Sequence, residues 1–188
     1  DIGVSLDGNG LVLTGSNGAD SIEIAGDVAV TVLGRDDADT ITGSFGDDVV
    51  VGGAGDDTIT GAAGDDAIDG GEGDDVAVFV GNQLDYTFAS SVDGLTVTIT
   101  ETSTGHVDTV TGVETLSFVD GDIGVSLDGN GLVLTGSNGA DSIQIVGDVA
   151  VTVLGLDEAD TLTGGLGDDI VAGGAGDDTI TGGEGDDV

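Results

Sequence analysis

The chain has 188 residues, enough for one domain or two small ones, and a formal net charge of −37. This acidic excess excludes nucleic acid as a partner, because phosphates would be repelled, and it disfavours anionic membrane surfaces. Cysteine is absent, which excludes disulfides and thiolate metal sites. No apolar run approaches the ~20 residues that span a bilayer, so we expect no membrane insertion. Cations are the expected partners.

Hydrophobic residues nevertheless make up 38% of the chain, mostly in short aliphatic runs. A strongly charged but aliphatic chain is expected to be unfolded while its carboxylates repel one another and folded once cations neutralise them. Residues 4–14 (VSLDGNGLVLT) begin this pattern with two expected strands around an Asp-Gly-Asn-Gly turn. We expect strands over 1–33, with an outlying repeat unit, GSNGADSIE, at 15–23.

A nine-residue period follows. The units are GRDDADTIT (34–42), GSFGDDVVV (43–51), GGAGDDTIT (52–60), GAAGDDAID (61–69) and GGEGDDVAV (70–78). Glycines at the first, second and fourth positions favour a tight turn, and the last three residues alternate as in a half-buried strand. One turn and one strand cannot bury an apolar face alone, whereas stacked units can. We therefore expect 1–78 to form a first β-roll block.

Residues 79–121 lack the nine-residue period and are expected to be a β-rich flanking or capping segment. Within it, LTVTIT (95–100) alternates as a strand does, and we expect no helix anywhere in the chain. The first block then returns. About 55 of the 66 positions in 1–66 are identical to those in 122–187, so 122–188 is expected to be a truncated second copy. Because the sequence repeats with a period of 121 residues, we expect the chain to be part of a longer tandem array.

The nonapeptides fit the pattern G-G-x-G-x-D-x-U-x, in which U is a large aliphatic residue, and 52–60 and 173–181 match it at every position. The pattern resembles the RTX (repeats-in-toxin) family of calcium-binding β-rolls. The segments FVGNQLDYTF (79–88) and VDTVTGVETLSFVDG (107–121) are also similar to segments that follow such blocks in proteins exported by type I secretion. The resemblance implies an all-β, parallel β-roll or β-solenoid with additional strands between the blocks.

The aspartates at the sixth position of each unit are the candidate metal ligands. In a β-roll two nonapeptides make one coil, so aspartates eighteen residues apart would stack ~4.8 Å from one another and repel by roughly 1–3 kcal/mol. A divalent cation between coils would reverse this, and calcium accepts mixed carboxylate and carbonyl oxygens in loose geometry more readily than magnesium does. The candidates are Asp39, Asp48, Asp57, Asp66, Asp75, Asp160, Asp169, Asp178 and Asp187.

The resemblance further implies that main-chain carbonyls at turn positions one and three complete the calcium shell. These positions are Gly43, Phe45, Gly52, Ala54, Gly61, Ala63, Gly173 and Ala175. The fifth-position aspartates, such as Asp56, are expected to point away from the ion, with some chance that a few add a ligand. The eighth-position aliphatic residues are expected to form the core: Ile41, Val50, Ile59, Ile68, Leu162, Val171 and Ile180.

Catalysis finds little support in the sequence. A nucleophilic triad would depend wholly on His106, and aromatic residues for stacking a sugar are scarce. Two functions remain open. One is an extracellular or cell-surface structural repeat protein, such as a fibre, surface layer or adhesin stalk, which folds on calcium and self-associates into rods or fibres. The other is the export and stabilising domain of a hydrolase or toxin secreted by the type I route, with its active site elsewhere. The long tandem duplication favours the first.

Overall fold

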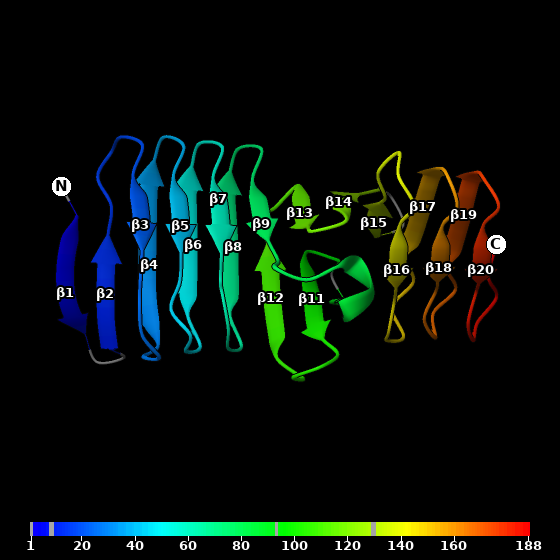
Figure 1. Ribbon diagram of the computed structural model, residues 1–188, viewed down its shortest axis with the longest axis horizontal. Coiled ribbons are helices and arrows are strands. Elements are labelled where there is room, and N and C mark those ends of the chain that lie inside the picture. Colours follow the sequence, from blue (N-terminus) through cyan, green and yellow to red (C-terminus); the bar gives the residue numbers. More distant parts are fainter. Residues whose placement is uncertain (1, 8–9, 93, 129–130) are drawn as a thin grey trace. The chain divides into compact units, whose positions relative to one another are not determined.

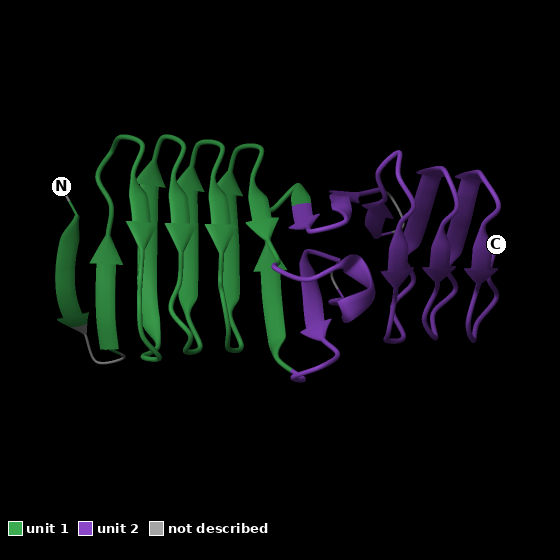
Figure 2. Cartoon of the chain, in the orientation of Figure 1, with its two compact units in different colours: residues 1–79, 106–115 green, residues 80–105, 116–188 purple. Residues whose placement is uncertain are grey.

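In the computed structural model the chain is almost entirely β (Figure 1), and residues 2–7, 10–92, 94–128 and 131–188 are described. Contacts divide it into two compact units (Figure 2). Unit 1 comprises Asp1–Phe79 and His106–Thr115, and unit 2 comprises Val80–Gly105 and Leu116–Val188. The expected flanking segment 79–121 is therefore shared between the two units, and its role as a cap stays a prediction.

Unit 1 is a β-solenoid with two strands per coil. Its strands are β1 (Gly3–Asp7), β2 (Gly10–Thr14), β3 (Ser21–Glu23), β4 (Val30–Asp36), β5 (Thr40–Thr42), β6 (Val49–Ala54), β7 (Thr58–Thr60), β8 (Ala67–Glu72), β9 (Val76–Val78) and β12 (Val107–Thr111). The chain alternates between two sheets, of order β1-β2-β4-β6-β8-β12 and β3-β5-β7-β9. Parallel neighbours are in register every eighteen residues, as in Val32–Val50–Ile68. Two nonapeptides per coil are thereby confirmed.

The strands around the first turn also match the sequence. β1 and β2 pair in antiparallel fashion, with Asp7 opposite Gly10, while the turn residues Gly8 and Asn9 lie outside the described part of the chain. At the other end of unit 1, β12 pairs in parallel with β8, with Val110 beside Ile68. Part of the flanking segment therefore extends the solenoid beyond the last nonapeptide.

Unit 2 repeats this architecture with additional strands. The strands of unit 2 are β10 (Tyr86–Ser90), β11 (Thr96–Glu101), β13 (Thr115–Phe118), β14 (Gly121–Leu127), β15 (Leu132–Thr135), β16 (Ser142–Gln144), β17 (Thr152–Asp157), β18 (Thr161–Thr163), β19 (Ile170–Ala175) and β20 (Thr179–Thr181). Thr115, the first residue of β13, belongs to unit 1. Two sheets run β13-β14-β15-β17-β19 and β16-β18-β20, and β10 pairs with β11. Among the described residues the only helix is the one-turn 3-10 helix η1 (Gln83–Asp85). It is too short to cross a membrane.

The core lies between the facing sheets of each unit. The eighth-position side chains Ile41, Val50, Ile59, Ile68 and Leu162 are at most 2% exposed, as expected. Val171 is only half-buried, and Ile180 is 46% exposed because β20 is the last strand of its sheet. Short aliphatic strands thus form a narrow core, and the polar turns at its edges hold the aspartates.

Candidate metal centre

The sixth-position aspartates of unit 1 form two hydrogen-bonded ladders along its turns. In ladder A (Asp20, Asp39, Asp57 and Asp75) each backbone N–H donates to Oδ1 of the next aspartate, over 2.7 Å at every step. In ladder B the amide of Val30 donates to Asp48 Oδ1, and that of Asp48 to Asp66 Oδ1, both over 2.8 Å. The eighteen-residue coil therefore places carboxylates directly above one another.

Unit 2 contains the matching ladders. Asp141 donates its amide to Asp160 Oδ1 over 2.9 Å, and Asp160 to Asp178 Oδ1 over 3.1 Å. On the other edge, Asp169 donates to Asp187 Oδ1 over 3.0 Å. All nine aspartates expected from the sequence thus occupy equivalent places. Asp20 and Asp141 occupy them too, and the outlying units 15–23 and 136–144 carried the signal for both.

Oδ1 is thus hydrogen-bonded in each ladder, but the second oxygen is frequently isolated. Among the described residues, five buried Oδ2 atoms have no hydrogen-bond partner, and their aspartates are at most 2% exposed. They belong to Asp39, Asp57, Asp66, Asp75 and Asp160. A buried carboxylate oxygen without a donor is costly, because folding removes it from water and offers nothing in return. A cation beside these oxygens would offset that cost.

The conformation of the second turn residue decides which oxygens are isolated. This residue is left-handed in each of the five turns concerned, at Arg35, Gly53, Ala62, Gly71 and Leu156. In two other turns the second residues, Ser44 and Gly165, donate their amides to Asp48 Oδ2 and Asp169 Oδ2 over 2.5 and 2.6 Å. The left-handed turn directs that amide elsewhere and leaves the carboxylate oxygen free. Its cost at Ala62, Arg35 and Leu156 is about 1–2 kcal/mol each, since these residues have a Cβ.

Carboxylate and carbonyl oxygens come close together at the first glycine of several turns, where a side chain would collide with them. A Cβ added to Gly34 would overlap both Asp39 Oδ2 and the carbonyl oxygen of Gly52 in the next coil. At Gly52 it would meet Asp57 Oδ2, and the carbonyl oxygen of Gly70 lies 2.6 Å from the same point. Carboxylate and carbonyl oxygens from two coils thus converge on one point, and these donors fit calcium.

No group of three acidic or histidine side chains gathers in the described part of the chain. Each candidate centre must therefore use main-chain carbonyls as well as carboxylates. Of the carbonyl oxygens expected, that of Gly52 lies close to Asp39 Oδ2, that of Gly61 close to Asp48 Oδ2, and that of Gly173 close to Asp160 Oδ2. The part played by Gly43 and by the third-position residues Phe45, Ala54, Ala63 and Ala175 stays a prediction.

Burial makes these carboxylates reluctant to ionise without a cation. It raises the pKa of Asp66 to about 7, and repulsion from Asp108 and Asp48 adds to the rise, although the hydrogen bond from the Asp48 amide opposes it. Burial likewise raises the pKa of Asp39, Asp57, Asp75 and Asp160. A bound divalent cation would reverse this effect, since it stabilises the ionised form.

The fifth-position aspartates behave differently. Asp47, Asp56, Asp65 and Asp74 are exposed, and they pair on the outside of the turns. Asp56 Oδ1 accepts the amide of Asp74 over 3.0 Å, and Asp47 Oδ1 that of Asp65 over 3.0 Å. They form an outer ladder of turn hydrogen bonds. His106, the only histidine, accepts a long 3.4 Å hydrogen bond from the Gly64 amide at Nδ1.

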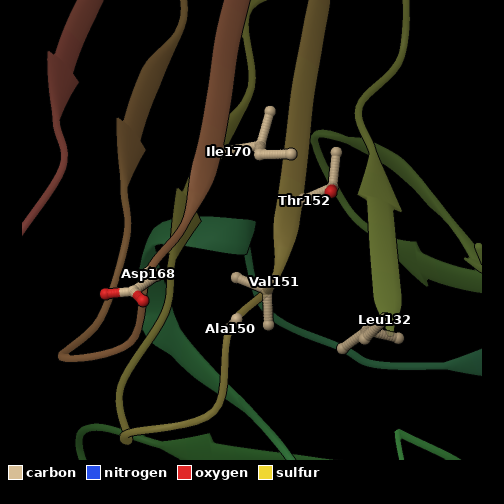
Figure 3. Close-up of a pocket in the computed structure, with 6 residues that line it drawn as sticks. All are labelled: Leu132, Ala150, Val151, Thr152, Asp168 and Ile170. Atoms are coloured by element: carbon tan, nitrogen blue, oxygen red, sulfur yellow. The ribbon is translucent and has the colours of Figure 1, made fainter. Parts of the chain in front are cut away.

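Two hollows in unit 2 offer little comparable chemistry. Figure 3 shows a cavity of about 20 Å³, lined by Leu132, Ala150, Val151, Thr152, Asp168 and Ile170, which holds about one water molecule. A larger and open hollow of about 340 Å³ has Glu184 as the one titratable side chain in a lining that is otherwise apolar, glycine or threonine: Ile145, Val146, Gly147, Thr163, Gly164, Gly165, Leu166 and Gly183. The turns at the edges of the solenoid are therefore the strongest candidate site.

Comparison with known proteins agrees with this geometry. A family model described as the RTX calcium-binding nonapeptide repeat (4 copies) matches residues 31–59, 42–77 and 154–188. Among solved structures, the extracellular lipase LipA from Serratia marcescens is similar over 86% of this chain and 29% of the lipase chain, with a TM-score of 0.49 and 22% identity. The chain thus spans less than a third of that structure. No curated protein matches the chain.

Proposed function

We propose that the chain, whose residues 31–77 and 154–188 match the RTX calcium-binding nonapeptide repeat, is a structural repeat protein of the cell exterior. In this proposal several calcium ions bind between successive coils, and their binding drives folding after export. The observation that carries the proposal is the set of five buried Oδ2 atoms without hydrogen-bond partners. Each belongs to a turn whose backbone leaves that oxygen free.

Calcium binding is expected to be strong enough to decide whether the chain folds. Each ion bound only by the native state adds about 2.7 kcal/mol at a hundredfold excess over its dissociation constant. The binding of a few ions therefore contributes a free energy comparable to the 5–15 kcal/mol free energy of unfolding that is typical of a whole domain. Without ions, the net charge of −37 opposes the compact state. Export as an unfolded chain from a low-calcium cytosol, as by type I secretion, would suit such a switch.

The structural role, as a fibre, surface layer or adhesin stalk, draws support from the duplication. A domain that only assists export needs one block, whereas near-identical copies at 1–66 and 122–187 suit a tandem array. Ile123 is 0% exposed and Leu132 is 1% exposed, so residues of the second copy pack as core residues of unit 2.

The test is a calcium titration followed by far-ultraviolet circular dichroism. We expect a largely unfolded chain in excess EGTA and a β-rich one in millimolar calcium, with no comparable response to magnesium. A full β spectrum in EGTA would contradict calcium-dependent folding. The complete gene separates the structural role from the alternative: many further copies support the array, whereas one block beside a catalytic domain supports an export domain.

A further inference from the structure

Ladder A does not end with the nonapeptides. The amide of Asp75 donates to Glu114 Oε2 over 2.9 Å, just as the amide of Asp57 donates to Asp75 Oδ1. The main chain keeps the same register. Val76, which follows Asp75, donates to the Asp57 carbonyl over 2.9 Å, and Thr115, which follows Glu114, donates to the Asp75 carbonyl over 3.1 Å. Glu114 thus occupies the place of a sixth-position aspartate in a coil that has no nonapeptide.

The carbonyl ligand recurs in this coil as well. A Cβ added to Gly70 would overlap the carbonyl oxygen of Gly112 and would lie 2.6 Å from Asp75 Oδ2. Gly112 therefore takes the place that Gly70 takes one coil earlier, beside Asp57. Asp75 is 1% exposed, and its Oδ2 is one of the buried oxygens without a partner. An unpaired, buried carboxylate oxygen thus lies close to a carbonyl oxygen that a residue outside the repeats supplies.

The sequence of this coil explains why the nine-residue pattern missed it. Gly112-Val113-Glu114 joins the first and sixth positions of a turn with one residue between them, where a nonapeptide has four. Glutamate has one methylene more than aspartate, and the longer side chain lets a carboxylate reach the ladder from the shorter turn. Val113 is 5% exposed and anchors this turn in the unit. Because Glu114 is exposed, water can complete a coordination shell on that side.

We propose that Asp75 Oδ2, the Gly112 carbonyl and the Glu114 carboxylate form a further divalent-cation site, suited to calcium, that fastens residues 106–115 to the end of the nonapeptide block. Calcium suits the site because carboxylate, carbonyl and water oxygens can share its loose shell, whereas magnesium demands a strict octahedron. This inference rests on the calcium-dependent function proposed above. It adds that the non-repeat segment supplies ligands of its own.

Native mass spectrometry of the full chain in saturating calcium tests the site by counting bound ions. Glu114→Gln keeps the shape of the side chain and an oxygen that can accept the Asp75 amide, but it removes the charge. Glu23→Gln, at an exposed position of β3 in the same unit, is the matched control, because the second copy carries Gln144 at the equivalent position. We expect Glu114→Gln to bind one ion fewer than the wild type and Glu23→Gln to bind the full number. Gly70→Ala, whose methyl group would displace the Gly112 carbonyl oxygen and Asp75 Oδ2, should lose the same ion.

Hydrogen exchange gives a second, local readout. In calcium, the amides of Thr109 and Thr115 should lose protection in Glu114→Gln, while those of Thr40 and Thr58 keep it. If Glu114→Gln binds as many ions as a calcium-binding wild type, the added site is wrong and the proposed function stands. If the wild type binds no calcium, both are wrong.

Discussion

At the scale of single residues, turn conformation and metal chemistry are linked. A left-handed second turn residue removes an amide donor from the sixth-position carboxylate, and the absence of a side chain at the first glycine lets oxygens of two coils come close together. The left-handed residue destabilises the calcium-free chain twice, through backbone strain where it is not glycine and through the buried carboxylate oxygen that it leaves unpaired. A bound cation would offset both costs, as the proposed function requires.

Substitutions of Asp57, in ladder A, and of Asp56, in the outer ladder, should distinguish a buried calcium ligand from an exposed turn residue. Asp57→Asn keeps an oxygen for the Asp39 amide but loses the charge beside Gly70, so the calcium concentration at the folding midpoint should rise by roughly tenfold or more. Asp56→Asn, at an exposed position, also keeps its acceptor for Asp74 and should shift the midpoint little. Circular dichroism during calcium titration measures both. Equal shifts would show that the assignment of the two aspartates is wrong.

The response to pH should change sign with calcium. The folded-state pKa of Asp66 is raised to about 7, so the calcium-free fold binds protons more tightly than the unfolded chain does. Its contribution to stability is complete below the unfolded pKa of about 4 and is lost as the pH rises through about 7. In EGTA, whatever folded protein remains should therefore have a higher melting temperature at pH 5 than at pH 8.

In saturating calcium the same comparison should reverse, because protons compete with the ion for the carboxylates. Melting temperatures at the two pH values, each with and without calcium, give the four measurements needed. Stability that rises with pH under both conditions would mean that these aspartates are not reluctant to ionise in the ion-free fold.

At the scale of secondary-structure elements, each three-residue strand of unit 1 buries only its middle side chain. Ile59 in β7 is 0% exposed, with β5 on one side and β9 on the other, whereas Ile180 in β20 is 46% exposed at the edge of its sheet. Both occupy the eighth position of the same peptide, GGAGDDTIT. Their difference is therefore one of neighbours rather than of sequence.

This pair provides a matched test of packing. In calcium, Ile59→Ala should lower the free energy of unfolding by about 2–5 kcal/mol, because it leaves a cavity in the core. Ile180→Ala should lower it by less than about 1 kcal/mol, since the side chain is already largely in contact with water. Urea unfolding at fixed calcium measures both values. Similar losses would show that the last coil is as well packed as the middle ones.

The same elements show what the sequence could and could not predict. A strict nine-residue period predicted the turns, the inward aliphatic side chains and the nine stacked aspartates, because each stacked unit meets nearly the same neighbours. Glu114 lies outside that period, and only the main-chain register reveals its place. Gln83 was likewise missed: it is 0% exposed, and its amide bonds Asp141 Oδ1 over 2.8 Å and the Ser142 N–H over 2.7 Å. Nothing periodic marks a residue that joins a distant strand.

At the scale of the whole molecule, the duplication raises the question of how units join in a longer array. The first copy runs into residues 79–121, and these run into the second copy without a proline or a serine- and glycine-rich linker. Part of that segment extends unit 1 through β12, and part belongs to unit 2, where Gln83 bonds Asp141. Residues 79–121 thus contribute strands to both units.

We therefore expect an array of three 121-residue repeats to be elongated in calcium. Its maximum dimension should increase in proportion to the number of repeats, while its cross-section stays constant. Calcium should also promote association of such arrays, because it neutralises much of the negative charge that otherwise keeps them apart. Small-angle scattering of one-, two- and three-unit arrays, in calcium and in EGTA, measures both effects. A compact particle, or a maximum dimension that does not increase in proportion to the number of repeats, would show that the repeats move independently, and the protein would then be a string of calcium-binding modules rather than a rod.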